Sequence, residues 1–298
     1  MKILLLGRNG QVGHELRRTL LPLGELLAVS RSDVDLADLE CLKAKLRQYQ
    51  PDLVVNAAAY TAVDKAEVEI ASAFKVNAEA VAVLADYARA YGARLLHYST
   101  DYVFDGAKGE PYAETDAVSP QNVYGKSKCA GEDAIRASGC DAIILRTSWV
   151  ISSHGKNFIK TILRLAQERD SLDVVADQIG APTSAELIAD VTALAVAAWL
   201  QHRLSAGTYH LTASGATSWH GLASYILERM LAQGGSTRLR PSAVRAVSTD
   251  DYPLPAKRPL NSRMNTEAIC GALGLTLPDW KNHVDRCVDQ LLQLDSST

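Results

Sequence analysis

A tyrosine and a lysine four residues apart, Tyr124 and Lys128, form the pair in this sequence best suited to proton chemistry. On a helix, this spacing places both side chains on one face. A free tyrosine has a pKa of about 10, but a neighbouring ammonium stabilises the phenolate and lowers that pKa. Such a tyrosine can give a proton to a carbonyl oxygen while a hydride reaches the carbon. Because the same spacing arises by chance on exposed helices, the pair needs support from other motifs.

Two hydroxyl residues lie where they could orient a substrate carbonyl for such a tyrosine. Ser99 and Thr100 directly follow the predicted strand Arg94–Tyr98. Ligands of parallel sheets bind beyond the carboxyl ends of the strands, so a hydroxyl here can orient a substrate carbonyl. An N-terminal glycine turn, a strand ending in Ser-Thr and a tyrosine–lysine pair, in this order, predict an NAD(P)(H)-dependent oxidoreductase.

The glycine turn is formed by Gly7, Gly10 and Gly13, directly after the first predicted strand. The first glycine permits a tight turn, the second removes a Cβ from the path of a pyrophosphate, and the third allows close helix packing. The helix that begins with Gln11 and Val12 offers free N–H groups to phosphates. We therefore predict a dinucleotide site, with an ordinary glycine turn as the alternative.

The end of the second predicted strand, Leu26–Val29, indicates which cofactor is used. An NAD-specific site usually has an acid there, which binds the ribose 2′-OH. Here Ser30 and Arg31 follow the strand, and an arginine can pair bidentately with a 2′-phosphate. We expect NADPH to be preferred, with NADH as a second donor. A solvated surface charge is the alternative for Arg31, and Asp33 and Asp35 are candidate capping residues.

The first half of the chain alternates strands and helices. The predicted strands are Lys2–Leu6, Leu26–Val29, Leu53–Asn56, Arg94–Tyr98 and Ala142–Arg146, and the predicted helices are Gln11–Leu21, Leu39–Tyr49, Val63–Tyr91 and Tyr124–Ser138. This alternation predicts an α/β fold with a Rossmann-like, doubly wound parallel sheet and right-handed crossovers. Every motif above lies at the carboxyl end of a predicted strand, where ligands are expected.

The pattern changes after about Ser148. Helices are predicted at Phe158–Glu168, Glu186–Leu200, His220–Leu231 and Lys281–Leu292, and short strands at Leu172–Val175, Thr208–Leu211 and Arg245–Val247. We expect residues 1–148 to form a dinucleotide-binding domain. Residues 149–298 are expected to form mainly a smaller α/β substrate-binding lobe, from which some segments return to the first domain.

Composition limits the kinds of partner and the cellular location that we expect for this protein. The net charge of −3 disfavours nucleic acid, which needs a basic face. Five scattered cysteines without a CxxC pair disfavour structural zinc and disulfides. The apolar stretches are too short for a membrane span, and the apolar N-terminal run is too short for a secretory signal. We expect a cytoplasmic protein without membrane contact.

Several segments together resemble the extended short-chain dehydrogenases. They are Gly7–Gly13, Asn56–Asp64, His97–Phe104 and Val123–Lys128. Within that superfamily the chain is similar to the dTDP-4-dehydrorhamnose reductase family, with further matches at Arg146–Val150, Asp177–Thr183 and Arg258–Met264. The matches reach into the second lobe, so they extend beyond the generic nucleotide-binding fold.

The resemblance implies reduction of the 4-keto group of dTDP-4-dehydro-β-L-rhamnose to dTDP-β-L-rhamnose. This is the last step of dTDP-L-rhamnose biosynthesis, which feeds cell-surface polysaccharide such as lipopolysaccharide O-antigen. By the same resemblance Tyr124 donates the proton, Lys128 lowers its pKa and binds the ribose, and Thr100 polarises the ketone. Whether the substrate carries thymidine or uridine stays open.

The resemblance also implies further contacts. Those with the substrate are Thr100, Asp101, Tyr102, Trp149, Asn157, Gln178 and Arg258, and those with the cofactor, besides the residues already named, are Asp35, Leu36, Ala58, Ala59, Tyr60 and Thr61. Arg258 suits a diphosphate by its geometry, although a surface salt bridge fits the sequence equally well. For Trp149 an ordinary core position is the alternative.

Some related enzymes are thought to dimerise through a magnesium ion held by glutamates. Glu15 and Glu186 match two of these, but the C-terminal counterpart is Gln290, next to Asp289. The loss of one anionic ligand weakens such a site. Mg²⁺ and a homodimer are expectations of the resemblance, with solvated helix charge as the alternative for both glutamates.

Two other functions fit the fold. An epimerase or 4,6-dehydratase retains NAD and returns the hydride, but a dehydratase also needs an Asp-Glu pair where this chain has Asp101 and Tyr102. A non-catalytic relative, such as a regulatory subunit of methionine adenosyltransferase, need not keep Thr100, Tyr124 and Lys128. The presence of all three favours an enzyme.

Overall fold

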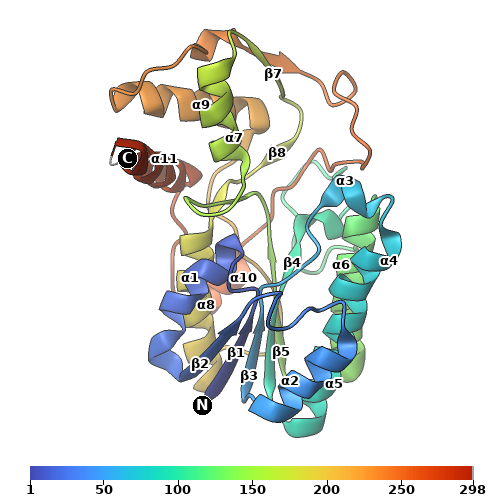
Figure 1. Ribbon diagram of the computed structural model, residues 1–298. Helices are drawn as coiled ribbons and strands as arrows, with labels where there is room; N and C mark the ends of the chain where they lie inside the picture. Colours follow the sequence, from blue (N-terminus) through green and yellow to red (C-terminus); the bar gives the residue numbers. More distant parts are fainter. Residues whose placement is uncertain (297–298) are drawn as a thin grey trace.

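A central sheet of six parallel strands dominates the computed structural model, which describes residues 1–296 (Figure 1). The strand order is β10-β5-β4-β3-β1-β2. The strands are β1 (Lys2–Leu6), β2 (Glu25–Val29), β3 (Leu53–Asn56), β4 (Arg94–Thr100), β5 (Ala142–Thr147) and β10 (Gly207–His210). The predicted doubly wound parallel sheet is confirmed. Residues 297–298, the end of the predicted second segment, lie outside the described residues.

Both faces of the sheet are covered, which is why its strands are nearly continuous apolar runs. In β1, Leu4 and Leu6 pack into one layer, and Ile3 and Leu5 pack into the other. Helices α2 (Leu39–Tyr49), α5 (Ala80–Tyr91) and α6 (Val123–Ser138) cover the first face, and α1 (Gln11–Thr19) and α8 (Ala185–Leu200) cover the second. The carboxyl ends of the strands thus remain as the open edge.

The helix predicted over Val63–Tyr91 is not continuous, and this prediction was wrong in that respect. The segment consists of α3 (Val63–Ala66), α4 (Ile70–Phe74), the π-helix η2 (Lys75–Glu79) and α5. The π-turn carries the buried Asn77, whose amide accepts from the Tyr60 N–H at 2.9 Å and donates to the Tyr60 carbonyl at 3.0 Å. The interruption therefore anchors the turn that follows β3.

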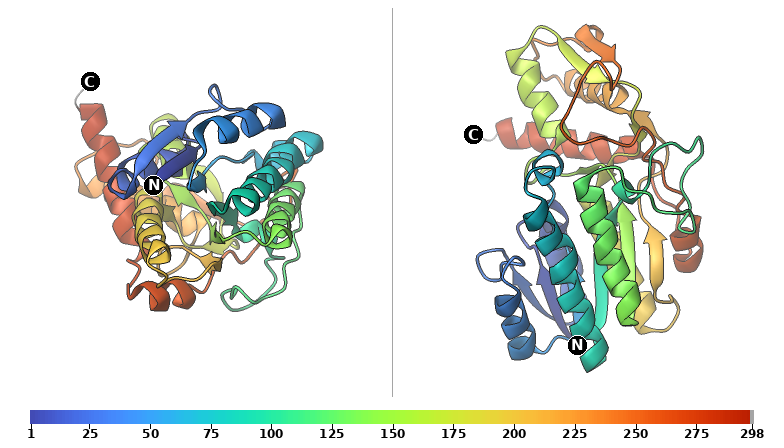
Figure 2. Two further views of the ribbon diagram at one scale, coloured as in Figure 1. Left: turned by 90° about the horizontal axis from the view of Figure 1, so that it is seen from below. Right: turned by 90° about the vertical axis from the view of Figure 1, so that its right-hand side faces the viewer.

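A smaller lobe lies beyond the carboxyl edge of the sheet (Figures 1 and 2). Its elements are β6 (Val150–Ile151), α7 (Phe158–Glu168), β7 (Leu172–Val175), β8 (Ile179–Gly180), β9 (Thr183–Ser184), β11 (Thr217–Ser218), α9 (Trp219–Ala232), β12 (Val244–Val247) and α11 (Trp280–Ser296). The strands of this lobe form three two-stranded sheets: β7 with β12, β8 with β11, and β6 with β9. The remaining elements are η1 (Leu21–Leu23), η3 (Asp101–Val103), η4 (Pro241–Ala243) and α10 (Glu267–Leu273).

Two segments of the second half belong to the sheet layer: β10 pairs with β5, and α8 packs on α1. The division at residue 149 stays a prediction. Among residues 1–296, no helix is both long and apolar enough to cross a bilayer.

Candidate active site

The three predicted catalytic residues come from two adjacent elements. Thr100 ends β4, while Tyr124 and Lys128 lie in the first two turns of α6. Asn122 caps this helix by accepting from the Gly125 N–H at 2.7 Å. A Cβ on Gly125 would stand 2.2 Å from the Tyr102 carbonyl oxygen, so only glycine lets α6 approach the chain after β4 this closely. The structure therefore brings the three residues to one place.

Tyr124 is held as a neutral phenol. Burial, helped by the nearby Asp101 and opposed by the hydrogen bond of Thr100, raises the pKa of Tyr124 to about 12. Lys128 does not contribute to this pKa: its Nζ donates to the Tyr98 carbonyl at 2.6 Å and lies 3.1 Å from His97 Nε2. The role of Lys128 in lowering the tyrosine pKa thus stays a prediction. A phenol that keeps its proton at neutral pH is the form that a proton donor needs.

Asp101 is a buried carboxyl group beside this phenol. It accepts from Ser262 Oγ at 2.5 Å and from Thr100 Oγ1 at 3.1 Å. Burial raises the pKa of Asp101 to about 6 despite these hydrogen bonds. Ser262 comes from the loop between β12 and α10. It lies inside the matched segment Arg258–Met264, but its own contact with Asp101 was not foreseen.

Asp101→Asn is expected to stabilise the fold at alkaline pH. A folded pKa above the unfolded value means that the folded state binds more protons, so stability falls as pH rises from about 4 to about 6. Asparagine carries no charge to bury, so the free energy of unfolding should rise by about 1–3 kcal/mol at pH 8 and by less at pH 5. Urea unfolding at the two pH values measures this, and an equal change at both would contradict it.

The glycine turn has the shape of a phosphate cradle. Gly7 has a φ of +87°, and a Cβ on it would stand 2.8 Å from the backbone of Ala57 and Ala58. A Cβ on Gly13 would stand 2.0 Å from the Gly7 carbonyl oxygen. The N-cap of α1, Gly10, offers no side chain to the first N–H groups, whereas asparagine or serine caps α6, α7, α8 and α9. The amides of Gln11 and its neighbours are thus open to an anion, as the fit of a pyrophosphate requires.

The end of β2 differs from the sequence-based expectation in one respect. The sequence places no acid at the strand end, but the Asp33 carboxylate folds back to accept from the Ser30 N–H at 2.8 Å and its Oγ at 2.7 Å. Arg8, which sequence reasoning missed, lies 3.5 Å from this carboxylate. Arg31 is 83% exposed and pairs with Asp35 at 3.1 Å. Two guanidinium groups, each paired with its own carboxylate, therefore lie near the end of β2.

Three predicted substrate contacts have partners within the chain. Trp149 stacks on Trp219 with ring centroids 3.5 Å apart. Gln178 accepts from the Trp219 Nε1–H at 3.1 Å. Arg258 forms a bidentate pair with Asp64, both contacts at 2.7 Å, which corresponds to the alternative of a salt bridge. It ties the loop after β12 to α3.

Two other predicted contacts connect the lobe and the site. Asn157 caps α7 and donates to Gln11 Oε1 at 2.9 Å, so it joins the lobe to the glycine turn. Tyr102 presents its ring edge-on to Tyr124, at 5.4 Å between centroids. The predicted cofactor residues Ala58, Ala59, Tyr60 and Thr61 form the turn after β3, and Leu36 is buried beyond β2.

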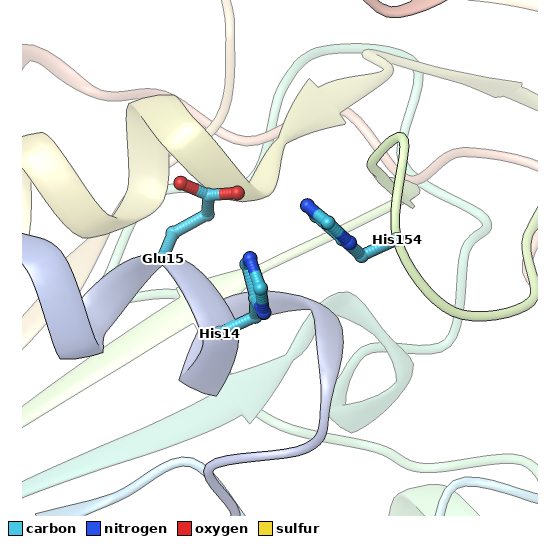
Figure 3. A group of neighbouring side chains, drawn as sticks. All are labelled: His14, Glu15 and His154. Carbon is cyan, nitrogen blue, oxygen red and sulfur yellow. The ribbon is translucent and has the colours of Figure 1, made fainter. Parts of the chain in front are cut away.

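The glutamates predicted to hold Mg²⁺ have other neighbours. The Glu186 carboxylate is paired with Arg286 at 2.5 Å and accepts from Gln290 at 3.2 Å. Glu15 lies instead with His14 and His154, with donor atoms within 4.8 Å of one another (Figure 3). Two of these three groups are imidazoles, which stack with ring centroids 3.7 Å apart, whereas Mg²⁺ prefers oxygen ligands. This arrangement does not support a Mg²⁺ site.

Comparisons with known proteins agree over nearly the whole chain. Residues 1–293 match the model of the RmlD substrate binding domain. A dTDP-4-dehydrorhamnose reductase of Burkholderia thailandensis is 48% identical, over 98% of this chain and 99% of the relative. The crystal structure of such a reductase from Clostridium acetobutylicum is similar with a TM-score of 0.89 and 35% identity, covering 98% and 100% of the two chains. Another, from Bacillus anthracis in complex with NADP, has a TM-score of 0.85 and 31% identity, with 97% and 99% covered.

Proposed function

Because the chain belongs to the RmlD substrate binding domain family, we propose that it reduces dTDP-4-dehydro-β-L-rhamnose to dTDP-β-L-rhamnose with NADPH. The observation that carries this proposal is the protonated Tyr124 beside Thr100, at the carboxyl edge of the sheet and next to an open glycine cradle. Reduction of a ketone needs a proton donor at the oxygen, and a phenol with a pKa of about 12 is protonated at any physiological pH.

Each residue has a defined task in this reaction. The uncapped N-terminus of α1 holds the cofactor pyrophosphate, and the bound cofactor supplies the hydride. Thr100 donates a hydrogen bond to the ketone oxygen and Tyr124 gives it a proton. In the structure Asp101 accepts the Thr100 hydroxyl proton, which turns to the ketone oxygen when the substrate binds, and Asp101 is itself held by Ser262. The loop that carries Ser262 and Arg258 excludes water from this side.

A coupled assay tests the proposal. Purified protein is mixed with NADPH and with dTDP-4-dehydrorhamnose generated in situ, and oxidation of NADPH is followed by absorbance; the uridine analogue runs in parallel. Oxidation with the thymidine substrate is the expected result. Stoichiometric NAD that copurifies, without net oxidation of NADPH, would identify an epimerase or dehydratase instead.

Cofactor preference is proposed to come from the guanidinium groups at the end of β2. Arg31→Ala removes an exposed charge that can turn from Asp35 to a 2′-phosphate. We expect KM for NADPH to rise by about tenfold, with KM for NADH changed less than twofold, since one charge-assisted hydrogen bond contributes about 1.5–3 kcal/mol. Arg47→Ala, an exposed arginine of α2, is the matched control. Equal effects on both cofactors would contradict the assignment.

A biosynthetic enzyme that consumes NADPH would work in the cytoplasm, and this location is part of the proposal. The homodimer also stays a prediction, which light scattering of the purified protein tests. Mg²⁺ is left out of the proposal because Arg286 occupies the Glu186 carboxylate.

A further inference from the structure

A buried chain of hydrogen bonds runs from the turn after β3 to Lys128, and the reaction as proposed does not use it. It passes through Asn56 at the end of β3 and His97 in β4, which stand opposite each other in the sheet register. The exposed fractions of Asn56, His97 and Lys128 are 1%, 0% and 2%. Water does not reach these groups, so each donor needs an acceptor inside the protein.

The direction of the chain is fixed at its first member. The backbone N–H of Ala58 can only donate, and it donates to Asn56 Oδ1 at 3.2 Å. The other end of the same amide, Nδ2, therefore faces His97 Nδ1 at 3.1 Å. Since Nδ2 is a donor, Nδ1 must accept, and the single proton of a neutral imidazole then lies on Nε2.

The last link concerns the charge of Lys128. Nε2 of His97 lies 3.1 Å from Lys128 Nζ, so its proton needs a lone pair there. An ammonium has three donors and no acceptor, whereas the neutral amine has one lone pair. The amine still donates to the Tyr98 carbonyl at 2.6 Å. All groups are thus paired when Lys128 is neutral.

The charged form of Lys128 cannot satisfy the same groups. An ammonium would donate to Nε2 and move the imidazole proton to Nδ1. Asn56 would then have to present Oδ1 to His97 and Nδ2 to the Ala58 N–H, which opposes two buried donors. A doubly protonated imidazole would break the same contact.

We propose that Asn56 and His97 are positioning residues that hold Lys128 as the neutral amine when no cofactor is bound. The chain starts at Ala58, in the turn expected to contact the cofactor, so it links that turn to the lysine. In the proposed reaction Tyr124 loses its proton, and the balance between the Lys128 amine and its ammonium form then sets how far the phenolate is neutralised. This consequence rests on the proposed function, but the state of His97 does not.

The groups around Lys128 act on its charge in both directions. Burial lowers the pKa of Lys128 to about 8, against the opposing charge of Glu132 on the next turn of α6. The Glu132 carboxylate is already paired with Arg146 of β5 and Arg136 of α6. Burial also lowers the pKa of His97 well below its usual value, with Lys128 as the second cause. Tyr124 lies one turn earlier on the same helix as a neutral phenol, and Asp101 of η3 acts on the pKa of that phenol.

The tautomer of His97 tests the proposal directly. NMR of cofactor-free protein labelled with ¹⁵N-histidine distinguishes protonated from unprotonated ring nitrogens, and His97→Gln identifies the signal of His97. From about pH 9 to about pH 10, above the pKa of about 8 of Lys128, we expect a protonated Nε2 and an unprotonated Nδ1. A proton on Nδ1, alone or on both nitrogens, overturns the proposal. An inactive protein with the expected tautomer would contradict only the proposed reductase function.

Asn56→Asp should reverse the direction of the hydrogen bonds between residue 56, His97 and Lys128. A carboxylate accepts both from the Ala58 N–H and from His97 Nδ1–H, so Nε2 becomes an acceptor and the ammonium becomes the paired form. We expect the His97 proton to move to Nδ1 and the Lys128-dependent limb of the kcat pH profile to move up by about one unit. If Asn56→Asp shifts the pH profile by the same amount when it is combined with His97→Gln, the new charge acts through space. That result would overturn the proposal. If the variant does not fold, the tautomer of the unchanged protein still decides.

Discussion

Tyr124→Phe is expected to lower kcat for the reduction of the nucleotide sugar by about 10²–10⁴-fold and to leave cofactor binding unchanged. The substitution removes one hydroxyl, while the ring can keep its edge contact with Tyr102 at 5.4 Å. In the proposed reaction the hydroxyl is the proton source at the carboxyl edge of the sheet, whereas the cradle at Gly7–Gly13 belongs to other elements. NADPH oxidation measures kcat, and quenching of tryptophan fluorescence measures the Kd for NADPH.

Tyr98→Phe provides a matched control for this experiment. Its hydroxyl is buried behind the site in β4 and pairs with Thr192 at 2.6 Å, so its loss should cost about 1 kcal/mol of stability and little rate. A Tyr124→Phe enzyme within fivefold of the unchanged kcat would refute the assignment of the proton donor. A similar loss in both variants would point to general damage of the sheet.

The features that sequence predicted best depend on neighbours along the chain. Tyr124 and Lys128 share a helix face through their spacing, and the ends of parallel strands necessarily meet at one edge. This is why the sheet, the glycine turn and the catalytic trio could be placed from residue types alone. The interruption of the helix before Asn77 was missed because a buried amide that binds a distant turn overrides local helix propensity.

The contacts that sequence missed join residues far apart. Ser262 reaches Asp101 across 161 positions, and His97 reaches Lys128 across 31 positions. Arg258 suited a diphosphate by type, yet in the fold Asp64 lies close enough to pair with it. Spacing fixes which side chains share an element, but the loop that covers them, and hence the partner of each charge, is decided by tertiary packing.

Glu132→Ala is expected to cost about 3–5 kcal/mol of the free energy of unfolding. Glu132 is fully buried and takes two hydrogen bonds from the equally buried Arg146, at 2.9 Å and 2.6 Å. Without the carboxylate, the Arg146 guanidinium loses both of these hydrogen bonds and stays in the core over the Phe104 ring, 5.0 Å away. Burial pushes the pKa of Glu132 up, but Arg146 outweighs it and the pKa is lowered, so this stabilisation is complete above the unfolded pKa and is lost as pH falls.

Arg136→Ala distinguishes the contribution of this buried pair to stability from that of a partly exposed charge. Arg136 contacts the same carboxylate at 2.5 Å, but its side chain is 42% exposed, so its loss should cost less than about 1 kcal/mol. Replacing both buried charges, as in Glu132→Leu with Arg146→Met, should recover much of the loss, because no charge is then left unpaired. Urea unfolding of the three variants and the unchanged protein gives the comparison. If Glu132→Ala costs no more than Arg136→Ala, the pair is not a desolvated ion pair, and the rigidity that it would give to the β5–α6 wall of the site must have another origin.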